Sequence, residues 1–125
     1  MKQKITTTLA PTPGGPFSQA IRVGNRVYVA GQTPIDPKTG TMPESFEEQT
    51  RQVMRNIEQV LEAAGAKLSD VVKVTTYLTD LDNFDTYNKV YREFFQEPLP
   101  ARSTIGCQLK GIPLEIDAIA EIEPA

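Results

Sequence analysis

The chain has 125 residues, of which 39% are hydrophobic and 23% charged, and its formal net charge is −3. This composition is typical of one soluble folded domain, residues 1–125, and it excludes a disordered chain. The acidic balance and the scattered basic residues argue against a nucleic-acid-binding protein, which needs a concentrated basic surface.

The first 30 residues predict a short strand, a loop and a hairpin. Residues 3–8 are rich in β-forming side chains. The segment 11–16 that follows contains three prolines and fits neither a helix nor an inner strand. Apolar residues then alternate in 20–23 and 26–30 on either side of Gly24-Asn25, a pattern typical of a β-hairpin with a two-residue turn.

A second irregular loop, residues 31–43, leads to the first predicted helix. Ser45, followed three residues later by Glu48, forms a capping-box pattern, and Gly65 predicts the end of the helix. Residues at three- and four-residue steps give this helix one core-facing stripe. The stripe consists of Phe46, Thr50, Val53, Met54, Ile57, Val60, Leu61 and Ala64. The β-branched run from Val71 to Leu78 predicts the next strand.

Asp82 is the predicted N-cap of a second helix, and Pro98 and Pro100 predict its end. The helical spacing of its aromatic and apolar residues indicates that they belong to the core. These residues are Phe84, Tyr87, Val90, Tyr91, Phe94 and Phe95. Two final strands are predicted over residues 100–105 and 114–120.

The element order predicts an α+β fold in which both helices lie on one face of a mixed sheet. In the last strand apolar residues from Leu114 to Ile122 alternate with Glu115 and other residues, so Glu115 is expected to point away from the helices. The predicted strands also contain Val27, Val29, Val72 and Val74. This apolar content favours partial burial of the open sheet face, so we expect that face to meet another subunit.

The sequence contains no histidine and one cysteine, Cys107. These counts exclude an internal disulfide and argue against a zinc site or a Ser-His-Asp hydrolase. Any hydrolysis must then rely on carboxylates, and Cys107 is expected to be a small buried apolar residue. Residues 1–6 lack the apolar core of a signal peptide, and no apolar run approaches the roughly 20 residues of a membrane span. The expected location is cytoplasmic, without membrane contact.

Arg102 and Glu115, on the two last predicted strands, are the candidate functional residues. A guanidinium presents a planar fork of donors that matches a carboxylate at two points, as a lysine does not. A nearby glutamate can position and polarise a water molecule. The pair therefore suggests a site for a small carboxylic acid that reacts with water. The alternative is a surface ion pair between neighbouring strands, which is the commoner origin of such a pattern.

Six motifs follow one another along nearly the whole chain. They are the segments 15–20 (GPFSQA), 29–34 (VAGQTP), 48–50 (EQT), 80–84 (DLDNF) with Asn88 and Tyr91, 100–103 (PARS) and 114–116 (LEI). Together and in this order they resemble the RidA (YjgF, reactive intermediate deaminase) family. Because several separated motifs match at once, the chain is identified as a member of that family.

The resemblance implies a homotrimer of chorismate-mutase-like subunits, each with a mixed six-stranded sheet that faces inward and two helices on its other face. It implies hydrolysis, without cofactor or metal, of 2-imino and 2-enamino acids such as 2-iminobutanoate, 2-iminopropanoate and 2-aminoacrylate to 2-keto acids and ammonia. Arg102 would clamp the substrate carboxylate, and Glu115 would orient the attacking water. Gly31, Phe84 and Asn88 would line a cleft between subunits.

Three further expected lining residues depart from the pattern that the resemblance implies. Phe17 stands where a tyrosine is frequent, Ala30 where a serine is frequent, and Thr104 where many members have cysteine. Phe17 and Ala30, together with Phe84, present carbon to the cleft. We therefore expect a preference for imino acids with apolar side chains.

Two alternatives remain open at this point. A trimer that binds a small carboxylate as a regulator, or that holds unfolded clients as a chaperone, would need Arg102 as much as an enzyme does. RNA cleavage has also been attached to the family, but the missing histidine and the acidic charge argue against it here.

Overall fold

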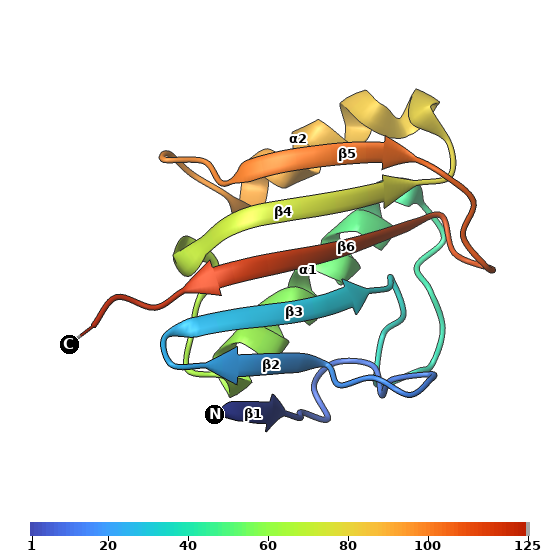
Figure 1. The fold of residues 1–125 in the computed structure, drawn as a ribbon. Coiled ribbons are helices and arrows are strands. Elements are labelled where there is room, and N and C mark those ends of the chain that lie inside the picture. The colour runs from blue at the N-terminus through green and yellow to red at the C-terminus, as the bar shows by residue number, and fades with distance from the viewer. Residues whose placement is uncertain (125) are drawn as a thin grey trace.

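The computed structural model describes residues 1–124, which form one sheet of six strands, two helices and two short 3-10 turns (Figure 1). In chain order the elements are β1 (Lys2–Ile5), β2 (Ala20–Val23), β3 (Arg26–Gln32), α1 (Phe46–Ala63), η1 (Leu68–Asp70), β4 (Val71–Leu78), η2 (Leu81–Asn83), α2 (Phe84–Phe94), β5 (Ala101–Gly106) and β6 (Leu114–Glu121). Among these residues, neither helix is both long enough and apolar enough to traverse a lipid bilayer.

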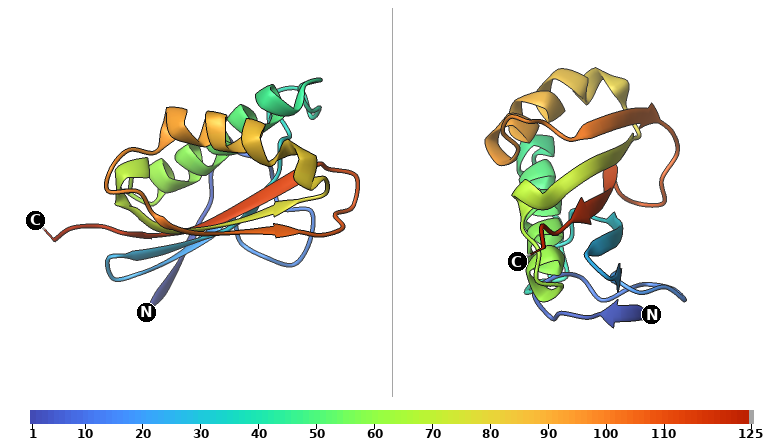
Figure 2. Two further views of the ribbon diagram at one scale, coloured as in Figure 1. Left: turned by 90° about the horizontal axis from the view of Figure 1, so that it is seen from above. Right: turned by 60° about the vertical axis from the view of Figure 1, so that its left-hand side comes forward.

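The strand order across the sheet is β1-β2-β3-β6-β4-β5, and every neighbouring pair is antiparallel except β4 and β5, which are parallel. Both helices cover the same face, as the two views of Figure 2 show. The predicted α+β architecture with a mixed sheet is therefore confirmed. The last strand does not extend the sheet at its edge. β6 instead lies in its middle, between β3 and β4, and β5 is left as an edge strand.

Local sequence signals explain where most elements begin and end. Gly24 adopts φ +59° in the predicted two-residue turn between β2 and β3. At the start of α1, the hydroxyl of Ser45 accepts a hydrogen bond of 3.1 Å from the backbone N–H of Glu48. The helix gives way at Gly65, which has φ +82°. The hairpin and the first helix are thus confirmed.

The predicted N-cap of the second helix, Asp82, is wrong by one residue: Asn83 is the N-cap of α2, and its side chain makes no capping bond. The carboxylate of Asp80, not of Asp82, accepts a backbone hydrogen bond, and the donor is the N–H of Asp82 at 2.9 Å. This bond opens the 3-10 turn η2, so α2 begins only at Phe84. An aspartate two residues upstream competes with a capping aspartate because its side chain closes a local turn with the backbone.

The apolar side chains divide unevenly between the two faces of the sheet. Three of the four valines that we expected to help cover the open face lie in the core instead: Val27, Val29 and Val74. Successive residues of a strand point to opposite faces, and the face under the helices takes this set. The open face carries the intervening residues, among them the cross-strand neighbours Tyr28 and Ile119.

One buried amide of α1 fixes the loop that follows β3. The side-chain Nδ2 of Asn56 donates to the backbone carbonyls of Thr33 and Ile35, both at 2.9 Å. Its Oδ1 accepts a hydrogen bond of 3.0 Å from Gln52. Asn56 is 1% exposed, so its side-chain amide is shielded from solvent. The helix therefore sets the position of the chain just after β3.

We expect Asn56→Ala to lower the free energy of unfolding by about 2–4 kcal/mol, because two carbonyls and one amide would lose their partners in the interior. Urea denaturation followed by circular dichroism measures this loss. Arg55→Ala is the matched control, since Arg55 is exposed on the adjacent helix position. Its effect should stay within about 0.5 kcal/mol. Equal effects of the two substitutions would contradict the assigned role of Asn56.

Candidate functional site

Arg102 on β5 and Glu115 on β6 are not neighbours in the sheet. β4 lies between their strands, where Val74 pairs with Arg102 and Tyr77 pairs with Glu115. The alternative of a surface ion pair across adjacent strands is therefore wrong. None of the salt bridges formed within residues 1–124 includes Arg102.

The two side chains also point to opposite faces of the sheet. Arg102 shares the helix-covered face with its partner Val74, which is fully buried. Glu115 lies between buried Leu114 and Ile116, so it points to the open face, as the alternation predicts. One chain thus holds two separate groups of candidate residues, one around Arg102 and one around Glu115.

The Arg102 guanidinium lies against aromatic rings of α2. Its Cζ is 4.8 Å from the ring centre of Tyr91, 5.2 Å from that of Tyr87 and 5.7 Å from that of Phe84. Cations are attracted to the faces of such rings, and the rings leave the planar N–H fork free to bind an anion. The predicted site residue Phe84 is thus placed beside Arg102.

A pocket of about 290 Å³ opens next to this guanidinium. Its lining comes from α2, from the segment that follows α2 and from the start of β5, and consists of Asn88, Tyr91, Arg92, Leu99, Pro100 and Arg102. It contains the predicted site residue Asn88. Arg92 and Tyr91 were not predicted to belong to the site. The helical periodicity placed Tyr91 in the core, and burial confirms this for its ring.

Three buried polar side-chain atoms in the described part of the chain have no hydrogen-bond partner, and all three belong to this neighbourhood. They are Asn88 Oδ1, Tyr91 Oη and Thr104 Oγ1. Asn88 and Tyr91 line the pocket, while Thr104 follows Arg102 by two residues and so shares its face of β5. Buried polar groups are nearly always paired in folded proteins, so this concentration makes the neighbourhood of Arg102 a candidate binding site for a polar group.

The carboxylate of Glu115 lies close to the backbone of β3 at Gly31. A Cβ atom added at Gly31 would lie 2.6 Å from the Oε2 atom of Glu115. The register between β3 and β6 shifts between Val29 and Gln32, so this contact falls at an irregularity of the ladder. Only glycine at position 31 leaves room for the carboxylate in this position.

Burial raises the pKa of the Glu115 carboxyl above its usual value, and the nearby carboxylate of Asp117 raises it further. The hydroxyl of Tyr77 donates a 2.9 Å hydrogen bond to Asp117 Oδ2 and so holds that second carboxylate in place. Asp117 and Tyr77 were not predicted to lie near Glu115. The period of two that placed Glu115 also puts Asp117 on the open face, but nothing in the sequence showed that Tyr77 would reach it.

The remaining predicted residues have different surroundings. Ala30 is next to Gly31 on β3 and half-buried, and its backbone N–H donates to the Gln19 carbonyl at 2.9 Å. Phe17 lies in the loop before β2 and is 53% exposed.

Cys107 is a free thiol just after β5 and is only half-buried, so the expectation of a buried residue is wrong. The edge position of β5 explains its exposure.

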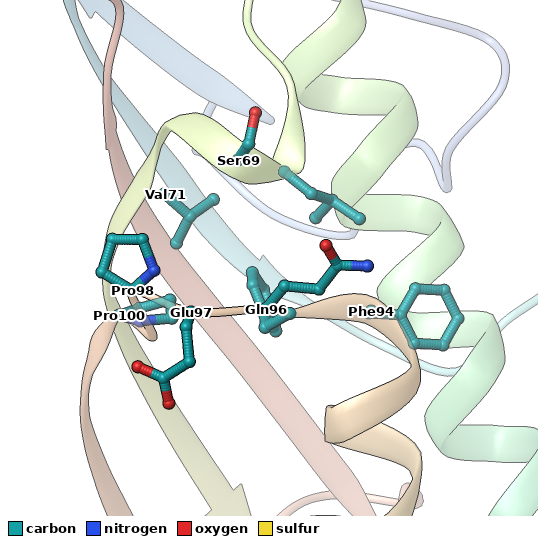
Figure 3. A pocket seen from close by; sticks show the side chains of 9 residues that line it. Ser69, Val71, Phe94, Gln96, Glu97, Pro98 and Pro100 are labelled. Carbon is teal, nitrogen blue, oxygen red and sulfur yellow. The ribbon is translucent and has the colours of Figure 1, made fainter.

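A second pocket lies on the other side of Pro100, between η1 and the segment after α2 (Figure 3). It has a volume of about 150 Å³, and Glu97 is the one titratable residue among those that line it.

In residues 1–124 no group of three or more cysteine, aspartate or glutamate side chains is close enough together to hold a metal ion. The structure is thus that of an α+β protein in which a pocket lined by polar side chains opens next to Arg102.

Comparison with protein families supports this class. The family model described as Endoribonuclease L-PSP matches residues 7–122. The chain belongs to this family, which is the RidA/YjgF family of the sequence motifs.

Individual proteins are similar to this chain over nearly its full length. A RutC family protein of Pyrococcus horikoshii is 50% identical over 123 residues, which are 96% of this chain and 98% of that protein. A 2-iminobutanoate/2-iminopropanoate deaminase of Dermatophagoides farinae is 45% identical over 125 residues, 98% of each chain. The structure of E. coli TdcF with bound serine has a TM-score of 0.92 and 36% identity, and covers 97% of this chain and 99% of that one.

We expect Gly31→Ala to displace the Glu115 carboxylate toward water, because the end of a flexible side chain moves more easily than the strand backbone. The pKa of Glu115 should then fall toward its usual value, with a stability loss below about 1 kcal/mol. Titration of the glutamate carboxyl carbons by NMR measures the shift. Gly14→Ala is the control, since nothing lies within 4 Å of a Cβ at that position. An unchanged titration of Glu115 in Gly31→Ala would contradict the contact.

Proposed function

We propose that this protein hydrolyses 2-imino and 2-enamino acids to 2-keto acids and ammonia without a cofactor. The observation that carries the proposal is the free fork of Arg102, which faces a pocket with unpaired polar atoms and has no carboxylate partner within residues 1–124. The deaminase name of the Dermatophagoides farinae relative supports the reaction class. The serine bound to TdcF supports a small ligand that carries a carboxylate.

The proposal requires more than one subunit. Arg102 and Glu115 lie on opposite faces of one sheet, so a complete site needs Arg102 of one chain and Glu115 of another. We propose the homotrimer of chorismate-mutase-like subunits that the sequence motifs imply, with the open sheet faces turned inward. Two large apolar residues favour this arrangement. In the isolated chain Val23 of β2 is 43% exposed and Tyr28 of β3 is 42% exposed.

In the proposed mechanism Arg102 binds the carboxylate of the 2-imino acid, which a 2-enamino acid forms by tautomerisation, at two points and thereby fixes the adjacent carbon–nitrogen double bond. The Glu115 carboxylate accepts a hydrogen bond from a water molecule and directs its oxygen at that carbon. The oxygen bonds to carbon, the carbon–nitrogen bond breaks, and the protons of the water end on the nitrogen, which leaves as ammonia. Imines already react with water, so positioning and charge neutralisation supply the required acceleration.

The residues proposed to line the cleft come from both groups. Phe84, Asn88 and Thr104 accompany Arg102, while Phe17, Ala30 and Gly31 are proposed to accompany Glu115. The two carbon-only side chains at positions 17 and 30 would favour the four-carbon imine over the three-carbon one.

RNA cleavage, the activity in the name of the family model, is not the proposed function. The chain has no histidine and carries a net charge of −3, so it lacks the usual general base and the basic surface of a ribonuclease. A regulator that only binds small carboxylates is the second candidate, because the free Arg102 fork suits binding without turnover.

We expect the native mass to be about three times 13.8 kDa. Analytical ultracentrifugation at micromolar concentration measures it. A monomer would contradict both the covered sheet face and the shared site.

We expect Arg102→Lys to lower kcat/KM for imine hydrolysis by at least about tenfold, because a point charge does not reproduce the two-point clamp. The melting temperature should change little, since Arg102 has no ion pair in its own chain within residues 1–124. An assay that couples a threonine dehydratase to keto-acid release measures turnover. Arg55→Lys is the control, because Arg55 is exposed on α1 and belongs to neither group. Unchanged turnover in Arg102→Lys would remove this residue from the site.

We expect Glu115→Gln to reduce turnover more than it weakens binding of 2-oxobutanoate, because the amide keeps the size but loses the charge that polarises the water. Turnover of the wild-type protein should fall as the pH drops through the raised pKa of Glu115, since only the ionised form accepts the water hydrogen bond. The glutamine variant should lose this acidic limb. Kinetics and calorimetry test both points, and parallel losses of turnover and affinity would favour the regulator.

A further inference from the structure

Two tyrosines of α2 lie against Arg102, but their hydroxyl groups have different surroundings. The Tyr87 hydroxyl is hydrogen-bonded to the hydroxyl of Thr76, and both residues are fully buried. The Tyr91 hydroxyl, one helical turn later, has no partner. Tyr91 is only 5% exposed, so solvent does not replace the missing bond.

Packing alone does not account for the Tyr91 hydroxyl. The ring of Tyr91 packs against Phe95 with centres 4.7 Å apart and meets Tyr87 edge to face with centres 5.7 Å apart. A phenylalanine would keep these contacts and the contact with Arg102. A buried hydroxyl without a partner destabilises the fold, so a polar group that arrives only with a ligand gives it a function.

The position of this hydroxyl relates it to the same ligand that Arg102 would bind. Tyr91 lines the pocket of about 290 Å³ together with Arg102 and Asn88. Its ring centre, 4.8 Å from the Arg102 Cζ, is closer to the guanidinium than the other two rings are. Burial raises the pKa of the Tyr91 hydroxyl although Arg102 acts in the opposite direction, so the group is a protonated donor at neutral pH.

We propose that Tyr91 is a binding residue whose hydroxyl donates a hydrogen bond to the carboxylate that Arg102 clamps. The inference rests on the proposed function in one respect, namely that the Arg102 pocket binds a small carboxylate. It adds a donor from α2 to the two donors of the guanidinium fork from β5. The carboxylate would then be held from the helix as well as from the sheet, which fixes its plane and rotation.

The test is the affinity of the intact oligomer for 2-oxobutanoate, measured by calorimetry on Tyr91→Phe. This substitution removes one oxygen and keeps the ring. We expect the Kd to rise about tenfold, the usual effect of losing one hydrogen bond to a charged group. The melting temperature should stay the same or increase, because the unpaired hydroxyl is removed from the interior.

Tyr87→Phe is the matched comparison on the same helix. It removes a hydroxyl that already has a partner, so it should lower the melting temperature and raise the Kd for 2-oxobutanoate less than Tyr91→Phe does. Wild-type affinity in Tyr91→Phe would overturn the inference. A drop in melting temperature like that of Tyr87→Phe, without a larger loss of affinity, would also overturn it, because the hydroxyl would then be structural.

Arg102→Lys separates this inference from the proposed function. If Arg102→Lys leaves the affinity for 2-oxobutanoate unchanged, the pocket is not a carboxylate site, and both proposals fail. If Arg102→Lys weakens binding while Tyr91→Phe does not, only the role of Tyr91 fails.

Discussion

The contact of the Arg102 guanidinium with the aromatic side of α2 is the interaction on which the proposed chemistry of this protein depends. A cation beneath a helix ordinarily requires a carboxylate partner, because desolvation of an unpaired charge is costly. Here three aromatic rings provide the favourable surroundings, and the charge stays available to a ligand. The contrast with Arg51 is clear, since its guanidinium is occupied by Glu48 and Glu93 at 2.7 Å each.

The placement of β6 in the middle of the sheet is the second constraint. It gives β6 two strand neighbours and buries one of its faces under the helices. It also brings Glu115 over Gly31, where the missing side chain allows the carboxylate to approach the backbone of β3. The same placement separates Glu115 from Arg102 by the sheet itself. A chain that uses both residues on one substrate must therefore associate with copies of itself, and the exposed apolar residues of the open face are consistent with that need.

The polar pattern around Arg102 supports the proposed binding pocket. Three polar atoms near one guanidinium are unpaired, namely the side-chain carbonyl oxygen of Asn88 and the hydroxyls of Tyr91 and Thr104. The buried side-chain amides of α1 are paired by contrast. Thr104 stands where cysteine is common in the related family, yet it keeps a hydrogen-bonding group at that place. Ala30 and Phe17 have no such group in their side chains, so the uncharged hydrogen-bonding side chains of the proposed cleft come from α2 and β5, and the other group contributes the Glu115 carboxylate.

The sequence by itself determined most of the elements and the face on which Glu115 lies. Capping and turn chemistry are local, so Ser45, Gly24 and Gly65 placed the first helix and the hairpin correctly. The period of two placed Glu115 on the open face, and separated motifs identified the family. Tertiary structure decided the rest. The order of strands depends on long-range pairing, which no local pattern encodes, and it separated Arg102 from Glu115 and buried the valines of β3 under the helices. The free hydroxyl of Tyr91 also could not be foreseen, because helical spacing reports which residues are buried and not which of their polar atoms find a partner.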